Sequence, residues 1–102
     1  MHLHHYKIDK LSKDLKRIVY DQIDIDKFKL FYFGSRVAGN HFERSDIDVG
    51  IEGSTPIDVH KLNNIKDKVE ELPILYTIDI VDFSKVPKRF HTIASKHKEY
   101  IN

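Results

Sequence analysis

Apolar residues recur at helical spacing near the start of the chain. The matching positions are Leu11, Leu15, Ile18, Val19 and Ile23. Lysines and aspartates fill the positions between them. Because residues three and four apart share one face of an α-helix, the pattern predicts an amphipathic helix that begins at Leu11 and ends between Asp21 and Asp26.

Three segments rich in aromatic and β-branched residues predict strands. They are FKLFYF (28–33), which stops at Gly34, SDIDVGIE (45–52), which Gly53 closes, and ILYTIDIVDF (74–83), which follows Pro73. Such residues pack well on a pleated surface, and glycine or proline at the ends marks turns. About a dozen residues link the first two segments, which leaves both parallel and antiparallel pairing open.

Helical patterns also fill the remaining segments. Ser54 or Thr55 can cap a helix that has Pro56 in its first turn and apolar spacing up to Leu72. Residues 36–39 leave room for a short helical turn, and a weaker helical pattern opens at Pro87 and continues through Phe90, Ile93, Ala94, His97 and Ile101. Strands that alternate with helices predict one layered α/β sheet.

Size and composition fit one globular domain over residues 1–102. The chain has 40% hydrophobic residues, and its 17 Lys+Arg against 16 Asp+Glu give a net charge of +1, which gives no reason to expect direct nucleic-acid binding. It has no cysteine, as a reducing cytoplasm permits. No run approaches the roughly 18 apolar residues of a membrane span. We therefore expect a cytoplasmic, soluble protein, and we assign no role to His2, His4 and His5.

Two aspartates interrupt the second predicted strand. In an extended chain, Asp46 and Asp48 point to the same face, and together they offer the oxygen ligands that Mg²⁺ prefers. Two such aspartates also occur at exposed turns, but Asp79 places a third acid among β-branched residues of the next strand. Asp82 competes for that third place. Strand alternation puts Asp82 on the opposite face, and therefore favours Asp79.

A turn with phosphate-binding character follows the first predicted strand. Gly34 and Ser35 can offer backbone N–H groups and a hydroxyl to phosphate oxygens, and Arg36 adds a cation next to them. A Gly-Ser pair alone is common in turns. Its significance here depends on the aspartates ten residues later.

The run GSRVAGNHFERSDIDVGI resembles the signature of the DNA polymerase β-like nucleotidyltransferase superfamily. In that signature Gly-Ser is followed after about ten residues by Asp-x-Asp, with a third Asp on a later strand; here Gly34-Ser35, Asp46, Asp48 and Asp79 match. The resemblance extends from about Phe31 to Phe83. Within the superfamily, the short chain is most similar to the minimal nucleotidyltransferases (MNT), the antitoxins of HEPN/MNT toxin-antitoxin pairs.

The resemblance implies a minimal nucleotidyltransferase core, with a small mixed sheet of three or slightly more strands packed by helices. It implies that Gly34, Ser35 and Arg36 bind the ATP triphosphate. It also implies two Mg²⁺ ions at three catalytic, metal-binding carboxylates, Asp46, Asp48 and Asp79. These would support in-line attack on the α-phosphorus, with AMP passing to a tyrosine of the partner HEPN ribonuclease toxin. One departure is that Val37 and Ala38 replace an Ala-Arg pair that is frequent in relatives.

Two other functions are compatible with the same residues. A non-catalytic antitoxin would neutralise its partner by contact and would keep the acidic cluster as a relic. A small-molecule nucleotidyltransferase would need a companion subunit, because a core of this size leaves little chain for an acceptor pocket. The same limit on size favours an acceptor that arrives on a partner protein.

Overall fold

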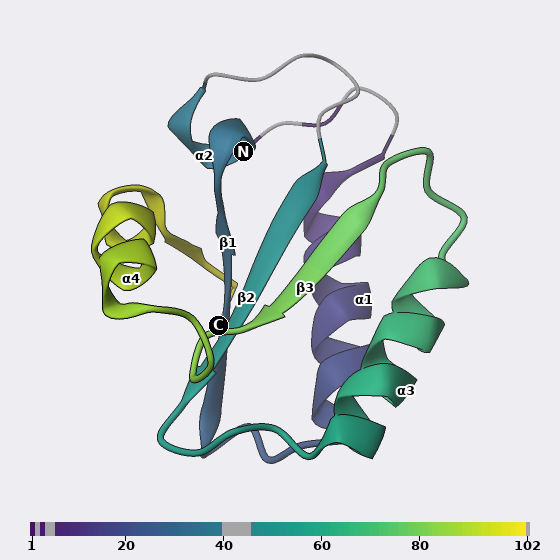
Figure 1. Cartoon of the computed structure of the whole chain (residues 1–102). Coiled ribbons are helices and arrows are strands. Elements are labelled where there is room, and N and C mark those ends of the chain that lie inside the picture. Colours follow the sequence, from purple (N-terminus) through teal and green to yellow (C-terminus); the bar gives the residue numbers. More distant parts are fainter. Residues whose placement is uncertain (2, 4–5, 40–45, 102) are drawn as a thin grey trace.

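The computed structural model describes residues 1, 3, 6–39 and 46–101 (Figure 1). The helices are α1 (Ile8–Tyr20), α2 (Ser35–Ala38), α3 (Val59–Glu70) and α4 (Lys88–Ala94), followed by a 3₁₀ turn, η1 (Ser95–His97). The strands are β1 (Phe28–Phe33), β2 (Ile47–Gly53), β3 (Ile78–Asp82) and β4 (Glu99–Tyr100). The three early histidines, His2, His4 and His5, lie outside the described residues.

The four strands form one mixed sheet in the order β3-β2-β1-β4. β1 runs antiparallel to β2 and β4, whereas β2 and β3 are parallel and are joined by the α3 crossover. The predicted α/β class with a small mixed sheet is confirmed, and the pairing that the sequence left open is antiparallel. The register places Asp48 opposite both Phe33 and Asp79.

Alternate residues of β1 face two different hydrophobic layers. Leu30 and Tyr32 pack in the layer formed with α1 and α3, whereas Phe31 and Phe33 pack with Phe83 in the layer that α4 joins. This division follows from the two-residue period of a strand. Figure 1 shows α1 and α3 side by side and α4 apart from them, along the opposite side of the sheet.

The helices α1 and α3 bury the positions that the periodicity predicts. These are Leu11, Leu15, Ile18 and Val19 in α1, and Leu62, Ile65 and Val69 in α3. Full burial of one such side chain stabilises the fold by about 1.5–3 kcal/mol. α1 begins one turn earlier than predicted, and among the described helices none is both long and apolar enough to cross a bilayer.

The predicted start of α3 at Ser54 or Thr55 is wrong. Asp58 caps the helix instead, since its carboxylate accepts hydrogen bonds from the backbone N–H groups of His60 and Lys61 at 3.1 and 3.2 Å. The segment before it is held outside the helix by a buried hydrogen bond, which the backbone N–H of Ile57 donates to the carboxylate of Asp82 at the end of β3, at 3.0 Å.

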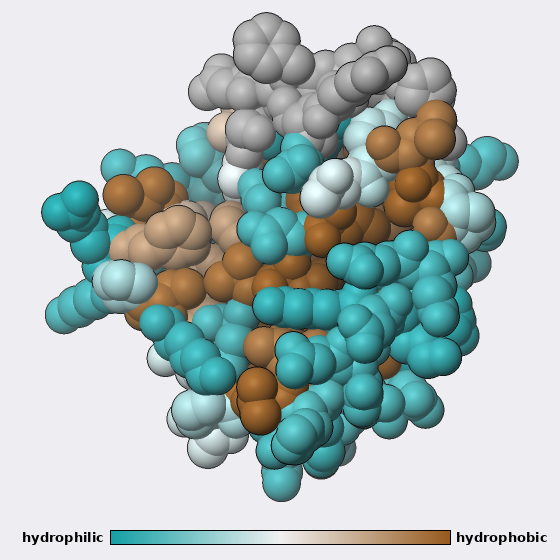
Figure 2. Space-filling view, turned by 45° about the vertical axis from the view of Figure 1, so that its right-hand side comes forward, coloured by the Kyte–Doolittle hydropathy of each residue, from teal (hydrophilic) through white to brown (hydrophobic). Residues whose placement is uncertain are grey.

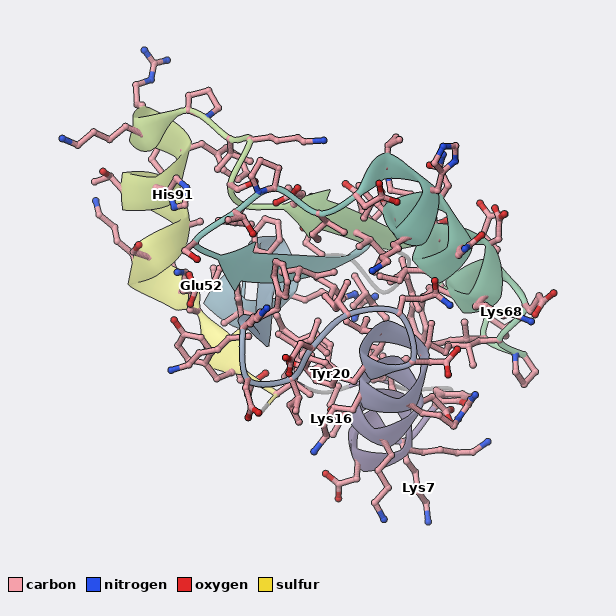
Figure 3. The ribbon with its side chains drawn as sticks, turned by 90° about the horizontal axis from the view of Figure 1, so that it is seen from below. Lys7, Lys16, Tyr20, Glu52, Lys68 and His91 are labelled. Atoms are coloured by element: carbon pink, nitrogen blue, oxygen red, sulfur yellow. The ribbon has the colours of Figure 1, made fainter. Side chains whose placement is uncertain are left out.

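The predicted helical pattern through Ile101 is also wrong beyond His97, where η1 ends. The chain turns and adds β4 to the edge of β1, where the Ile101 N–H donates to the carbonyl of Leu30 at 2.9 Å. Two side chains of this segment, Lys98 and Tyr100, bond to Glu52 at 2.9 and 2.6 Å. Figure 3 shows Glu52 beside this last segment. The second and third strands are shorter than predicted and begin at Ile47 and Ile78.

Candidate active site

Two of the predicted carboxylates lie on adjacent strands. Asp48 of β2 and Asp79 of β3 are direct partners in the parallel register. Ile47 and Val49, on either side of Asp48, are fully buried in the layer under α1 and α3. Asp48 therefore projects from the opposite face, and the same alternation brings Asp79 to that face.

Asp46 lies at the entrance to β2, one residue before the strand, and its side chain is exposed. The N–H of the next residue, Ile47, donates to the carbonyl of Thr77 at 2.9 Å, which holds this point of the chain beside the start of β3. Asp46 is thus near the carboxylate pair but outside the regular strand in which the alternation placed it.

Asp48 lies in the electrostatic field of the other two carboxylates. Burial, followed by the charges of Asp79 and Asp46, raises the pKa of Asp48 from its ordinary value of 3.8 to about 6. Repulsion of this kind is what a bound cation relieves, and a set of carboxylate oxygens has the chemistry that suits Mg²⁺.

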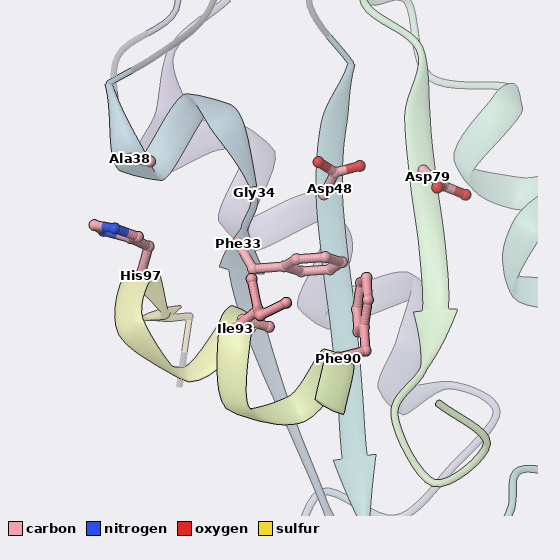
Figure 4. Close-up of a pocket in the computed structure, with 9 residues that line it drawn as sticks. Phe33, Gly34, Ala38, Asp48, Asp79, Phe90, Ile93 and His97 are labelled. Atoms are coloured by element: carbon pink, nitrogen blue, oxygen red, sulfur yellow. The ribbon is translucent and has the colours of Figure 1, made fainter. Parts of the chain in front are cut away.

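The carboxylates would have to converge to hold an ion. Within the described ranges, no three histidine, aspartate or glutamate side chains are close enough together to hold a metal ion in their present orientations. In Figure 4 the Asp79 carboxylate points away from Asp48. The donor set fits Mg²⁺, and binding would require the Asp79 side chain to turn toward Asp48.

Gly34 brings the predicted phosphate turn against this pair. It ends β1 with φ +85°, a conformation that favours glycine. A Cβ at this position would overlap Oδ2 of Asp48 and lie 3.1 Å from its Cγ. Glycine is therefore required both for the turn and for the close approach of Asp48. Ser35 begins α2 directly after this turn; its side chain is outside the described part of the structure.

A cavity of about 530 Å³ joins the turn and the carboxylates (Figure 4). Its volume falls within the range of pockets that hold small molecules. The residues that line it are Phe33, Gly34, Ala38, Asp48, Asp79, Phe90, Ile93, Ala94 and His97. The residues from α4 and η1 were predicted only as a helical pattern, because helical spacing does not show which side chains face a cavity.

Arg36 lies away from the cavity lining. Its side chain is only 3% exposed, and the guanidinium carbon lies 4.6 Å from the centre of the Tyr76 ring. This stacking fixes α2 against the segment that leads into β3. A direct contact between Arg36 and phosphate remains a prediction.

Asp82 has a different role in the fold from Asp79. It is 5% exposed and accepts hydrogen bonds from the backbone N–H of Ile57 at 3.0 Å and from the N–H and hydroxyl of Ser84 at 3.0 and 2.7 Å. These bonds tie the end of β3 to the segment before α3. Asp82 is thus engaged by neighbouring chain segments, whereas Asp79 is exposed beside Asp48.

A model of the family described as "Polymerase beta, Nucleotidyltransferase" matches residues 13–101. The chain belongs to this family. The match begins within α1 and ends just after β4, so it includes the Gly34 turn, the three carboxylates and the α4 wall of the cavity.

One curated relative of this polymerase beta nucleotidyltransferase is described as "Probable protein adenylyltransferase MntA" from Haemophilus influenzae (strain ATCC 51907 / DSM 11121 / KW20 / Rd). The two are 26% identical over 72 residues, which cover 71% of this chain and 63% of the relative. The chain therefore matches less than two thirds of the length of that relative.

Solved structures share the fold. A crystal structure of a toxin-antitoxin with AMP-PNP matches with a TM-score of 0.70 and 17% identity, over 89% of this chain and 72% of that chain. A structure of tri-AMPylated Shewanella oneidensis HEPN toxin in complex with MNT antitoxin matches with a TM-score of 0.67 and 15% identity, over 93% and 72% of the two chains. At these identities the likeness extends to the fold of this polymerase beta nucleotidyltransferase and no further.

Proposed function

We propose that this chain is a Mg²⁺-dependent protein adenylyltransferase that transfers AMP from ATP to a tyrosine of a HEPN-type toxin, and so acts as its antitoxin. The observation that carries the proposal is the single cavity that joins the Gly34 turn to Asp48 and Asp79. The family match and the curated relative support the reaction, and the toxin-antitoxin structures support the nucleotide and the partner. The proposal includes a cytoplasmic location, which the absence of cysteine from the sequence permits.

Each residue of the site has an assigned task in this proposal. Gly34, Ser35 and Arg36 bind the triphosphate at the turn, and Arg36, which is stacked on Tyr76, also supports the turn from inside the fold. Asp46, Asp48 and Asp79 hold Mg²⁺. Two bound Mg²⁺ ions would neutralise the triphosphate and activate the attacking hydroxyl.

The edge position of β3 suits an acceptor carried by another protein. Asp79 is exposed on this outermost strand, so a tyrosine presented by a partner can approach the carboxylates without entering the fold. The hydroxyl oxygen would form a bond to the α-phosphorus, the bond to pyrophosphate would break, and the phenolic proton would pass to solvent.

The test is a transfer assay with labelled ATP, Mg²⁺ and the toxin encoded by the adjacent gene. We expect label on the toxin, and we expect Asp48→Asn and Asp79→Asn to lower the rate roughly 100-fold or more, because each removes a charge that holds the metal. Asp67→Asn, an exposed change on α3, is the matched control. Circular dichroism would verify that the variants fold.

Absence of label on the toxin, with a nucleotidyltransferase of known activity working under the same conditions, would refute the proposal. If Asp48→Asn still neutralises the toxin as fully as the wild-type protein, neutralisation occurs by contact and the proposed antitoxin mechanism is wrong. Transfer to a small molecule but never to protein would also refute it.

A further inference from the structure

The helix α4 presents two large apolar side chains to the cavity that contains the carboxylates. Phe90 is 40% exposed and Ile93 is 60% exposed, and both line the cavity together with Gly34 and Asp48. Figure 2 shows hydrophobic surface gathered over α4, and Figure 4 places these side chains on the α4 side of Asp48. Exposed apolar surface inside a pocket is stabilised when a ligand covers it.

The apolar wall is already held in place. The Phe90 ring packs edge-to-face on Phe33, with centroids 6.0 Å apart, and lies 5.7 Å from the ring of Phe83. His91 on the same helix is in hydrogen-bond contact with the Phe83 carbonyl at 2.6 Å. A wall fixed by such contacts loses little conformational freedom when a flat ring binds to it.

The two ends of the cavity differ in chemistry. The end at Asp48 and Asp79 is anionic and suits a metal-bound phosphate chain, whereas the end at Phe90 and Ile93 is apolar. A nucleotide has the same division, with phosphates at one end and a flat aromatic base at the other. We propose that Phe90 and Ile93 of α4, together with Phe33, form the binding wall for the nucleobase of ATP, an inference that rests on the proposed function.

The topology separates this wall from the approach of the acceptor. Asp79 lies on the edge strand β3, whereas α4 leads through η1 into β4, which pairs with β1 at the opposite edge of the sheet. An acceptor that reaches Asp79 from the β3 edge leaves the α4 wall to the nucleotide. We therefore assign the base of ATP as the aromatic ring that covers Phe90. The alternative occupant of this wall is the tyrosine ring of the acceptor.

Calorimetric titration with two ligands tests this assignment. ATP and inorganic tripolyphosphate, each with Mg²⁺, would be titrated into the wild-type protein, Ile93→Ala and the double variant Phe90→Leu/Ile93→Ala. We expect the double variant to bind ATP about tenfold more weakly, because the base loses the side chains on which it stacks. The double variant should bind tripolyphosphate as tightly as the wild-type protein does. Val59→Ala, an equally simple truncation of an exposed apolar residue on α3, should change neither affinity.

Ile93→Ala serves as the variant that should fold normally, because the Ile93 side chain is mostly exposed. It should weaken ATP binding by a smaller factor than the double variant does. Unchanged ATP affinity in the double variant would overturn the inference. A raised KM for the toxin with unchanged ATP affinity would assign the wall to the acceptor and overturn it as well. If the wild-type protein transfers AMP but the variants bind ATP as tightly as the wild-type protein does, only the inference fails. If the wild-type protein binds no ATP, the proposed function fails and the inference fails with it.

Discussion

Folding favours the protonated form of the Asp48 carboxyl group. Burial, followed by the charges of Asp79 and Asp46, raises its pKa from 3.8 to about 6. Between these two values the folded state keeps a proton that the unfolded state has lost. The contribution of Asp48 to stability is therefore complete below about pH 4 and is lost as the pH rises through about 6.

Replacement of this residue should stabilise the protein when no divalent cation is present. We expect Asp48→Asn to raise the free energy of unfolding at pH 7 by about 1 kcal/mol, after allowance for the solvent screening of a half-buried carboxylate. The gain should shrink toward zero at pH 4. Urea denaturation at several pH values measures it, with Asp67→Asn as the control. A variant no more stable than the wild-type protein at pH 7 would show that the charge of Asp48 does not destabilise the folded chain.

Sequence alone could predict the shared face of the carboxylates but not the environment of Arg36. Strand alternation is local, so it puts Asp48 and Asp79 on the side opposite the buried residues of their own strands. The direction of Arg36 depends on Tyr76, which lies forty positions along the chain and comes near only in the folded sheet. No local pattern carries that information.

The sequence predicts the helices and strands whose apolar pattern repeats several times, but it does not predict β4, the shortest strand. α1 and α3 each bury three or more residues at helical spacing, and this repetition makes a pattern visible. β4 has only two residues and exists because Phe31 and Tyr32 offer it a free strand edge. Its formation is a tertiary effect, so the helical spacing of its neighbours misled the prediction.

The attachment of β4 depends on one acidic residue of β2. Glu52 accepts from Lys98 at 2.9 Å and from the Tyr100 hydroxyl at 2.6 Å, while the Lys98 ammonium also lies 4.6 Å from the centre of the Phe31 ring. The Lys98 side chain is 14% exposed, so loss of its partner would leave a largely buried charge without compensation.

We expect Glu52→Gln to lower the free energy of unfolding by about 1–2 kcal/mol, because it weakens a charge-assisted hydrogen bond in a partly buried setting. It should also speed hydrogen exchange at the Ile101 N–H, which bonds to the Leu30 carbonyl. Denaturation and exchange measured by NMR check both effects. Glu70→Gln, an exposed change in α3, is the control. Equal stability and equal exchange in Glu52→Gln and the wild-type protein would show that β4 is held by its backbone alone.

At the scale of the whole molecule, the two faces of the sheet have separate tasks. One face is covered by α1 and α3 and supplies the large hydrophobic layer. The other has a smaller aromatic layer under α4, and the carboxylates and the cavity lie on this side. A chain of 102 residues can therefore keep a stable core and still leave a cavity at one end of a sheet face.

Nucleotide and cation should stabilise this open face together. At a concentration about 100 times its Kd, Mg²⁺-ATP should add about 2.7 kcal/mol to the free energy of unfolding, since it binds only the folded chain. For a domain of this size, that gain raises Tm by about 10 °C or more. Scanning calorimetry with ATP plus Mg²⁺, and with ATP plus EDTA, measures the coupling.

The shift should disappear when EDTA removes the cation, because the phosphates would then meet Asp48 and Asp79 with like charge. Asp48→Asn should show a smaller shift with Mg²⁺-ATP than the wild-type protein does, whereas Asp67→Asn should match the wild-type protein. An equal shift with and without EDTA would mean that ATP binds independently of a cation. Since the carboxylates would then have no cation to share with the triphosphate, that result would remove the link between the acidic pair and the nucleotide on which the proposed reaction depends.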